Sequence, residues 1–288
     1  MTSSKIKFVT DSVADLPPEL AQKWGITVVP CFVNYGGNSY ADDGVELVRE
    51  DYYHELGRMS EFPTTSAMPP DFARERIEPL FDEADHVIIL ATPVKLSGIY
   101  NAMRLAVADY PPERVTVIDS GMISIGMGFQ AVLGAEVAAE TGDVQYTLRA
   151  IQAARENIKV YAAIATMEFL RRSGRVGWAA ASIGALLQIK PLVEVRDGDV
   201  LPAARARTFN RALDKVAQLV REQGELERVG MLHINNPESM NDLQQRLSDV
   251  MPDNVVTGMI CPAIGSHIGP GAVGIVTVKK GWKDAIGA

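Results

Sequence analysis

The residues VIILATPVKLSGIYNAMRLAVADYPPERVTVID, positions 87–119, contain one complete strand–helix–strand unit. Val87–Thr92 is a short apolar run of the kind that forms a buried strand. Gly98–Asp109 is predicted to be a helix, because the tyrosine and two prolines that follow would end it. Val115–Asp119 is predicted to be the next strand. Strands separated by helices of this length indicate a parallel α/β sheet.

The same alternation continues on both sides of this unit. Lys5–Thr10 is predicted to be a strand, and the DLPPEL sequence is predicted to open a helix with Asp15 as its N-cap. Thr27–Tyr35 is predicted to be one β-strand, followed by an acidic loop in ADDGVEL and a short helix in REDYYHEL. A long alanine-rich helix is expected from about residue 125 to residue 140. We therefore expect an N-terminal open parallel α/β/α sheet.

Three polar loops follow the strands of this expected sheet. They contain Thr10-Asp11-Ser12, Thr92 with Ser97-Gly98, and Asp119-Ser120-Gly121. Open α/β sheets bind ligands beyond the carboxyl ends of their strands. A ligand site is therefore expected at this edge of the sheet.

The second half of the chain has a different pattern. Lys159–Ala165 is predicted to be a strand, Pro191–Leu201 a hairpin that turns at Asp197-Gly198, and Ala272–Lys279 a final alternating strand. This pattern favours an α+β fold with a largely antiparallel sheet. We expect two domains, residues 1–156 and 157–288, which agrees with a chain of 288 residues.

Composition excludes several classes of protein. The 28 basic and 36 acidic residues give a formal net charge of −8, which argues against a nucleic-acid partner. No run of residues has the length and apolar character of a membrane span, so we expect a cytoplasmic protein without an integral membrane segment. Cys31 and Cys261 lie in apolar surroundings without CxxC spacing, and buried reduced thiols are favoured over a disulfide.

The chain contains no familiar catalytic or cofactor motif. GMISIGMG, residues 121–128, has glycines but lacks the lysine of a P-loop, so its small residues are expected to serve close helix packing. The four histidines are scattered without metal-ligand spacing, and no GxSxG sequence occurs. We expect neither a metal nor a cofactor.

Three segments with hydroxyl or imidazole side chains have two readings each. Ser97 directly precedes a helix, where serine is usually a cap, although the exposed Gly98 N–H at a helix start also suits an anion. The hydroxyls of Thr64-Thr65-Ser66 serve either loop hydrogen bonds or an anion. His267 precedes Gly269-Pro270-Gly271, and a turn histidine and a functional one are equally compatible with this pattern.

The stretch MEFLRRSGRVGWAAASIGALLQIKPLVEV, residues 167–195, combines Arg175 with a helix of unusually small residues. The small positions would let a slim apolar chain or a neighbouring helix approach closely, while Arg175 stays near a polar end. They are Ala179, Ala180, Ala181, Gly184 and Ala185.

Six motifs in this order resemble the DegV family of bacterial fatty-acid-binding proteins. They are KIKFVTDSVADLPPEL, the Thr65-Ser66 pair, LSGIYNAMRLA, VIDSGMISIGMG, RRSGRVGWAAASIGALLQIKPLVEV and HIGPGAVGIV, and they cover nearly the entire chain. The chain departs from the usual family pattern at Ala67-Met68, at Ile99 and at Ser173.

The resemblance implies a two-domain protein that binds one long-chain fatty acid in a buried tunnel. The family residues that hold the carboxylate match Thr65, Ser97, His267 and Arg175. The family presents its fatty acid to an ATP-dependent fatty acid kinase, which makes an acyl phosphate for phospholipid synthesis. The arginine associated with docking that kinase matches Arg207, in RARTF.

Two other functions remain alternatives at this point. A small-molecule enzyme could use Ser97 as nucleophile and His267 as base, but no acid that would orient the histidine is near it in sequence. A lipid-sensing regulatory protein would differ only in its partner.

Overall fold

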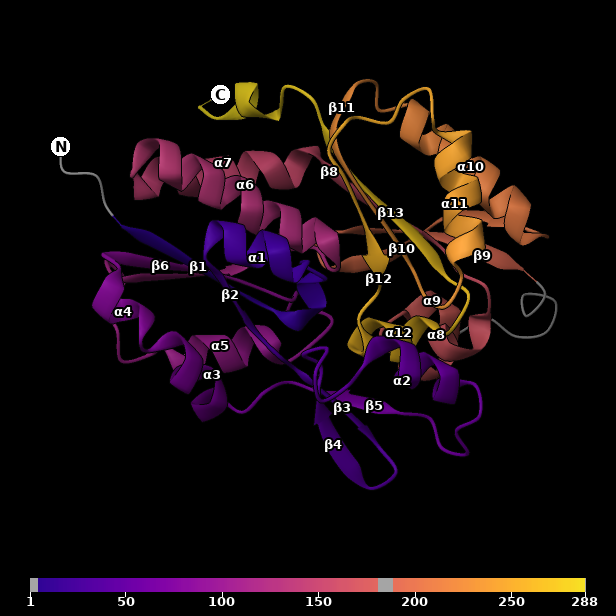
Figure 1. The fold of residues 1–288 in the computed structure, drawn as a ribbon, viewed down its shortest axis with the longest axis horizontal. Helices are drawn as coiled ribbons and strands as arrows, with labels where there is room; N and C mark the ends of the chain where they lie inside the picture. Colours follow the sequence, from indigo (N-terminus) through magenta and orange to yellow (C-terminus); the bar gives the residue numbers. More distant parts are fainter. Residues whose placement is uncertain (1–4, 181–188, 288) are drawn as a thin grey trace.

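The fold is described from a computed structural model of the chain, for residues 5–180 and 189–287. Figure 1 shows two main sheets. The N-terminal half of the chain forms a parallel sheet with its helices, and the C-terminal half forms a second, larger sheet. The N-terminal sheet has the strand order β2-β1-β6-β7, and every pair in it is parallel. Its strands are β1 (Ile6–Asp11), β2 (Ile26–Val29), β6 (His86–Ala91) and β7 (Val115–Asp119).

Helices cover both faces of the parallel sheet, as expected for strands connected by helical crossovers. In Figure 1 one group lies above the sheet and the other below it. The upper helices are α1 (Pro18–Trp24), α6 (Ile125–Thr141) and α7 (Val144–Asn157). The lower helices are α3 (Pro70–Ile77), α4 (Leu80–Glu83) and α5 (Ile99–Ala106).

The C-terminal sheet has the order β10-β9-β8-β13-β11-β12 and is antiparallel except between β11 and β12. Helices α10 (Phe209–Arg221) and α11 (Pro237–Arg246) pack on one face around a separate apolar cluster. The strands are β8 (Ile158–Ala163), β9 (Lys190–Arg196), β10 (Asp199–Ala206), β11 (Leu226–His233), β12 (Val255–Met259) and β13 (Val273–Lys279).

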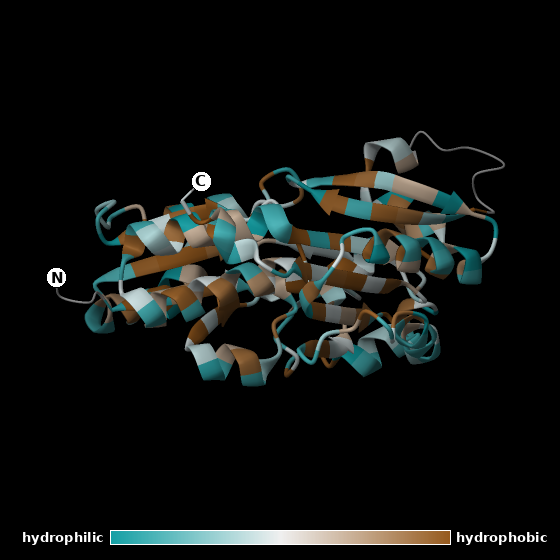
Figure 2. Cartoon of the chain, turned by 90° about the horizontal axis from the view of Figure 1, so that it is seen from above, coloured by the Kyte–Doolittle hydropathy of each residue, from teal (hydrophilic) through white to brown (hydrophobic). Residues whose placement is uncertain are grey.

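Helix α6 connects the two sheets because its glycines allow close approach on several sides. A methyl group on Gly134 would lie 2.9 Å from the Phe8 ring of β1, and one on Gly126 would lie 2.6 Å from Val160 of β8. A methyl group on Gly128 would lie 2.8 Å from the backbone oxygen of Ala14. The sequence-based prediction that the glycines of residues 121–128 serve packing is thus confirmed for Gly126 and Gly128. Figure 2 shows the result as apolar strands enclosed by helices with hydrophilic outer faces.

A third, small sheet lies beside the carboxyl edge of the parallel sheet and has the order β4-β3-β5. Four short helices lie on one side of it in Figure 1. The strands are β3 (Phe32–Tyr35), β4 (Asn38–Ala41) and β5 (Thr64–Ser66), and the helices are α2 (Arg49–Leu56), α8 (Met167–Ser173), α9 (Gly177–Ala180) and α12 (Pro262–Ile268). Two 3-10 turns, η1 (Ser12–Ala14) and η3 (Trp282–Ala285), complete the elements named here.

Two local predictions are wrong. Thr27–Tyr35 is not one strand: β2 ends at Val29 and β3 starts at Phe32 in another sheet. Pro30 lacks an N–H for the ladder, and the Cys31 N–H donates to the Ser12 hydroxyl at 3.1 Å.

The predicted hairpin is confirmed, with its turn at Asp197-Gly198 between β9 and β10.

Asp15 is not the N-cap of the first helix. Helix α1 begins at Pro18, with Pro17 at the cap position and no side-chain cap bond. Asp15 instead ends η1 in a left-handed conformation (φ 48°) and directs its carboxylate into the protein interior. The helix starts two residues later than predicted, and Pro17, which occupies the cap position, has no side-chain acceptor that could cap it.

In the described part of the chain, no helix is both long enough and apolar enough to cross a membrane.

Candidate functional site

A cavity of about 130 Å³ lies where the loops of the parallel sheet meet the free face of the antiparallel sheet. This is about ten times the space of one buried water. The loops contribute residues such as Val13, Thr92 and Ile123, and the antiparallel sheet contributes a wall rich in valine. The prediction of a site at the carboxyl edge of the parallel strands therefore coincides with a real cavity.

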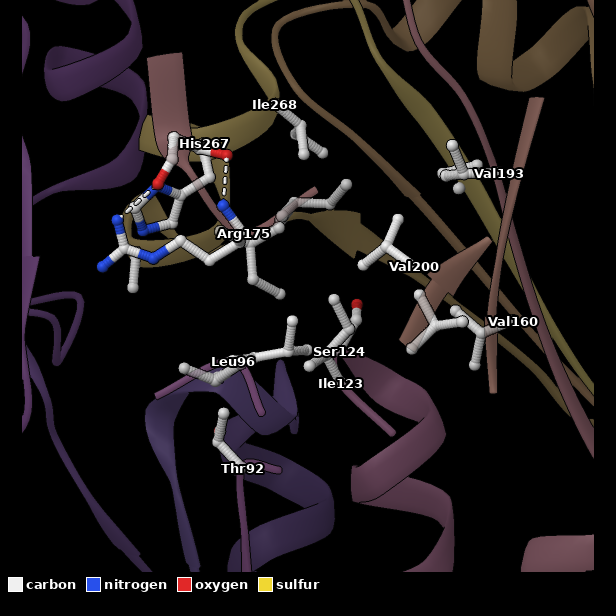
Figure 3. Close-up of a pocket in the computed structure, with 18 of the residues that line it drawn as sticks. Thr92, Leu96, Ile123, Ser124, Val160, Arg175, Val193, Val200, His267 and Ile268 are labelled. Carbon is white, nitrogen blue, oxygen red and sulfur yellow. Dashed lines mark hydrogen bonds between the residues drawn. The ribbon is translucent and has the colours of Figure 1, made fainter. Parts of the chain in front are cut away.

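The polar side chains of this cavity gather mainly at one end. Figure 3 shows His267 and Arg175 side by side there, with Val160 and Val193 at the opposite end. Thr65 and Ser97, also predicted from the sequence, line the same cavity. Arg175 is exposed and His267 is half-buried, so the polar end reaches the protein surface.

Thr65 and His267 are joined directly, although they are far apart in the chain. The Thr65 Oγ1 lies 2.8 Å from His267 Nε2, which connects β5 with α12. Burial and the positive charge of Arg175 lower the pKa of His267 to about 4. The imidazole is therefore neutral at physiological pH, with one N–H donor and one acceptor nitrogen.

Arg175 is positioned by the end of helix α8. Gly174 ends this helix in a left-handed conformation (φ 70°), which turns the chain back toward the cavity. The Arg175 N–H donates to the Ser173 hydroxyl at 3.2 Å, and the guanidinium Nη1 donates to the Ser173 carbonyl at 2.6 Å. A guanidinium has five N–H donors, so others remain for an anion at the polar end.

Ser97 lies at the start of α5, where the cap and ligand readings were both open. Gly98, not Ser97, occupies the cap position of α5, and no side chain caps the helix there. The Ser97 hydroxyl accepts a weak hydrogen bond from the Ile99 N–H at 3.3 Å and also lines the cavity. Gly98 is exposed, and a methyl group on it would lie 3.7 Å from Ala67 Cβ. This contact places the start of α5 beside the strand that carries Thr65.

Arg207 lies away from the cavity. It is exposed and sits between the end of β10 and Thr208, the N-cap of α10. Its guanidinium makes no ion pair or hydrogen bond with any residue in the described ranges 5–180 and 189–287. Arg207 is therefore not among the residues that line the cavity.

Part of the small-residue segment lies outside the described residues, namely Ala181, Gly184 and Ala185. Helix α9 is described as far as Ala180, and Ala179 in it is fully buried. Trp178 anchors this helix to β10, because its Nε1–H donates to the Val200 carbonyl at 2.9 Å.

A buried polar network, which the sequence did not point to, holds α12 in place. Asp42 accepts a hydrogen bond from the Ala263 N–H at 2.9 Å, and Asp15 accepts one from the Cys261 N–H at 2.7 Å. Arg49 lies 3.3 Å from the Asp15 carboxylate and donates to the Met259 carbonyl. The start of α12, and with it His267, is fixed by side chains from the N-terminal half.

Helix α2 holds α12 from the other side. The Tyr52 hydroxyl lies 2.6 Å from the Ser266 hydroxyl, and the Tyr53 hydroxyl points to the carbonyls of Ile260 and Cys261 at 2.8 Å each. The only sequence signal for this network was the acidic, tyrosine-containing segment that follows β4. Its charges resembled an ordinary solvated loop and helix.

Burial changes the ionisation of the network. It raises the pKa of Asp42 to about 7 and raises the pKa of Asp15, although Arg49 opposes the shift in both. One oxygen of Asp42, Oδ1, has no hydrogen-bond partner among the described residues. Burial also raises the pKa of both thiols, and Cys31 and Cys261 are buried and free, as predicted.

Comparison with known proteins decides the family. A model of the DegV family, described as uncharacterised proteins, matches residues 5–280. The chain belongs to the DegV family. A DegV domain-containing protein of Deinococcus radiodurans is 32% identical over 275 residues, which cover 94% of this chain and 97% of that protein. One of Clostridium perfringens is 29% identical over 283 residues, with 96% and 99% covered.

Solved structures of DegV proteins share the fold. A DegV family protein from Thermus thermophilus, described as fatty acid binding, has a TM-score of 0.88 at 31% identity, with 96% of this chain and 99% of that chain covered. DegV from Bacillus subtilis, described as a fatty acid binding protein, has a TM-score of 0.87 at 26% identity, with 96% and 100% covered. The expected fold, a parallel α/β sheet followed by a largely antiparallel one, is confirmed.

Proposed function

We propose that this DegV protein binds one long-chain fatty acid in the cavity and holds its carboxylate at the polar end. One observation carries the proposal: the cavity is apolar over most of its wall, while Thr65 and His267 are in contact and His267 lies beside Arg175 at the end that reaches the surface. Ser97 lines the same cavity. An ionised carboxylate is costly to bury without partners, so the head group belongs there and the tail belongs in the apolar part.

The two ends of the fatty acid have different tasks in this proposal. Each buried methylene contributes about 0.8 kcal/mol, so a tail of about 14 methylenes offers roughly 11 kcal/mol before the costs of binding. A hydrogen bond to a charged group contributes only about 1.5–3 kcal/mol. The tail therefore supplies most of the affinity, and the polar residues determine which end of the molecule faces outward.

The polar end can bind a carboxylate without a further ionisation step. In the tautomer that this proposal requires, neutral His267 carries its proton on Nε2 and donates it to Thr65 Oγ1, which leaves the threonine O–H free to donate to the carboxylate. Arg175 supplies the positive charge, and the Ser97 hydroxyl and Gly98 N–H supply donors at the start of α5. The contact between Thr65 and His267 also speaks against an enzyme in which His267 would activate Ser97.

The lipid content of the purified protein tests this function. Protein produced in bacteria should carry one fatty acid, which native mass spectrometry detects as added mass and which denaturation releases. Protein that arrives empty and whose melting temperature does not respond to oleate or palmitate would contradict the proposal.

The partner in this proposal is an ATP-dependent fatty acid kinase, which phosphorylates the presented carboxylate for phospholipid synthesis. Arg207 is proposed as a contact for it, because the side chain is exposed, unpaired among the described residues and remote from the cavity. Arg207→Ala should keep its fatty acid and lose acyl-phosphate formation with the cognate kinase. Arg149→Ala, at an exposed arginine of α7, serves as the control. Loss of lipid from the Arg207 variant would instead place this residue in the binding site.

A further inference from the structure

The antiparallel sheet forms a wall of the cavity that is not flat. Two rows of residues cross its central strands on the cavity side. The first row is Val193, Ala162, Gly274 and Leu232, which are direct neighbours on β9, β8, β13 and β11. In the second row the residues beside Ala162 and Gly274 are Val160 and Val276. The side chains in the middle of the first row are therefore small, whereas the corresponding side chains of the second row are valines that project further into the cavity.

Gly274 is partly accessible although its strand lies between β8 and β11, inside the sheet. Ala162, its partner on β8, is partly accessible as well. Both residues line the cavity, so their accessible surface faces its interior. The two small residues thus form a depression in the wall, which we call the trough.

The two usual structural reasons for a glycine do not apply at Gly274. Its φ angle is not among the positive values that favour glycine. A methyl group on it would lie 3.7 Å from its nearest neighbour, the carbonyl oxygen of Tyr161, which is ordinary contact. Gly230, on the neighbouring strand, is different, because a methyl group there would lie 2.4 Å from Ile125.

A glycine inside a strand weakens the strand and often marks a place where a ligand approaches the backbone. We propose that the trough at Gly274 and Ala162 receives the acyl chain, and that the missing side chain at Gly274 determines how long a chain the cavity accepts. This inference rests on the proposed function and assigns a task to the last glycine of HIGPGAVGIV, which the head-group residues leave unexplained.

The test compares Gly274→Val and the milder Gly274→Ala with matched substitutions at Gly258. Gly258 is a half-buried glycine of the same sheet, next to Leu232 on β12, and it does not line the cavity as described. A methyl group there would lie 3.4 Å from Leu232, so we expect Gly258 to tolerate an alanine about as well as Gly274 does. The affinities of delipidated proteins are measured for saturated acids from decanoate to stearate.

Wild-type affinity should rise steadily with chain length. In Gly274→Val the rise should stop once the chain is long enough to reach β13, so the preference for stearate over decanoate should fall by about tenfold or more. Gly274→Ala should cause a smaller change of the same kind, and both Gly258 variants should keep the wild-type profile. If Gly274→Val does not fold, Ala162→Val narrows the trough from β8.

Two results would overturn the inference. In one, the Gly274 variants weaken all the acids by the same factor, as a general loss of structure would. In the other, their chain-length profile does not differ from that of wild type. A wild-type protein that binds none of the acids would refute the proposed function itself, which is a distinguishable outcome.

Discussion

The two sheets meet the cavity in opposite ways. The parallel sheet is covered by helices on both faces, so only its strand ends and loops can reach a ligand, and they bring hydroxyl and backbone groups. The antiparallel sheet is covered by α10 and α11 on one face only, so its other face reaches the cavity with aliphatic side chains. The loops of the parallel sheet therefore contribute polar groups such as Thr92 and Ser97 to the cavity, and the antiparallel sheet contributes apolar surface.

Helix α12 stands between these two regions, because it belongs to the C-terminal half but is held by residues of the N-terminal half. The buried pair of Arg49 and Asp15 and the cap from Asp42 fix its start, while His267 near its end faces the cavity. This polar network from the N-terminal half therefore fixes the helix that carries His267.

The largest expected effect comes from breaking this network at Arg49. Arg49→Met leaves Asp15 fully buried without its cation, which should lower the free energy of unfolding by about 3–5 kcal/mol. Chemical denaturation measures the loss. The control is Arg221→Met, since Arg221 and Asp249 form an exposed pair whose loss should affect stability far less. Equal losses would show that the Arg49 network does not anchor α12.

The polar end is tested by Thr65→Ala, Ser97→Ala and the double variant. Each single change should remove about 1.5–3 kcal/mol from the binding of a fatty acid, because a buried carboxylate loses a charge-assisted bond. The two losses should not add, since both hydroxyls share one partner. The rise in melting temperature on adding palmitate measures these effects.

If Ser97 is only a cap, Ser97→Ala should lower the stability of free and loaded protein equally, by about 1 kcal/mol. Equal ligand-induced rises in all four proteins would remove both hydroxyls from the site.

The ionisation of Asp42 is expected to have an effect on the order of 4 kcal/mol. Its pKa in the folded protein is about 7, above the value of an exposed aspartate, so the folded state binds more protons than the unfolded state in this range. Stability that is present at low pH is therefore lost as the pH rises toward 7.

A comparison of Asp42→Asn with wild type isolates the titration of Asp42. The other groups with shifted pKa values, such as Asp11 and His267, are present in both proteins. The free energy of unfolding of the variant minus that of wild type should increase between about pH 4 and pH 7 and stay constant above. Urea denaturation at several pH values measures it. A difference independent of pH would mean that Asp42 keeps an ordinary pKa.

The smallest effect is expected where the two regions touch at the surface. The Lys95 Nζ lies 2.7 Å from the Asp199 carboxylate and so joins the loop after β6 to the β9–β10 hairpin, but both side chains are about half exposed. Lys95→Met should change the free energy of unfolding by about 0.5 kcal/mol or less. A larger loss, measured by denaturation in low and high salt, would show that this contact holds the hairpin against the parallel sheet.

The predictions that held depended on local patterns. The strand–helix–strand unit of residues 87–119, the hairpin turn at Asp197-Gly198 and the packing role of Gly126 and Gly128 follow from periodicity and turn chemistry. The errors at Asp15 and in Thr27–Tyr35 arose where a side chain or strand found a distant partner. A carboxylate that bonds to a residue about 250 positions away leaves no local signal.

The sequence alone therefore determined the order and type of most elements, the character of the two halves and the residues suited to an anion. The proposed domain boundary after residue 156 and the role of Arg207 remain predictions. Only the tertiary structure brought Thr65 and His267 within 2.8 Å, placed the Asp15, Asp42 and Arg49 network beneath α12, and formed the trough at Gly274. The physical reason is that periodicity and capping act over a few residues, whereas burial and hydrogen bonding between segments depend on packing of the entire chain.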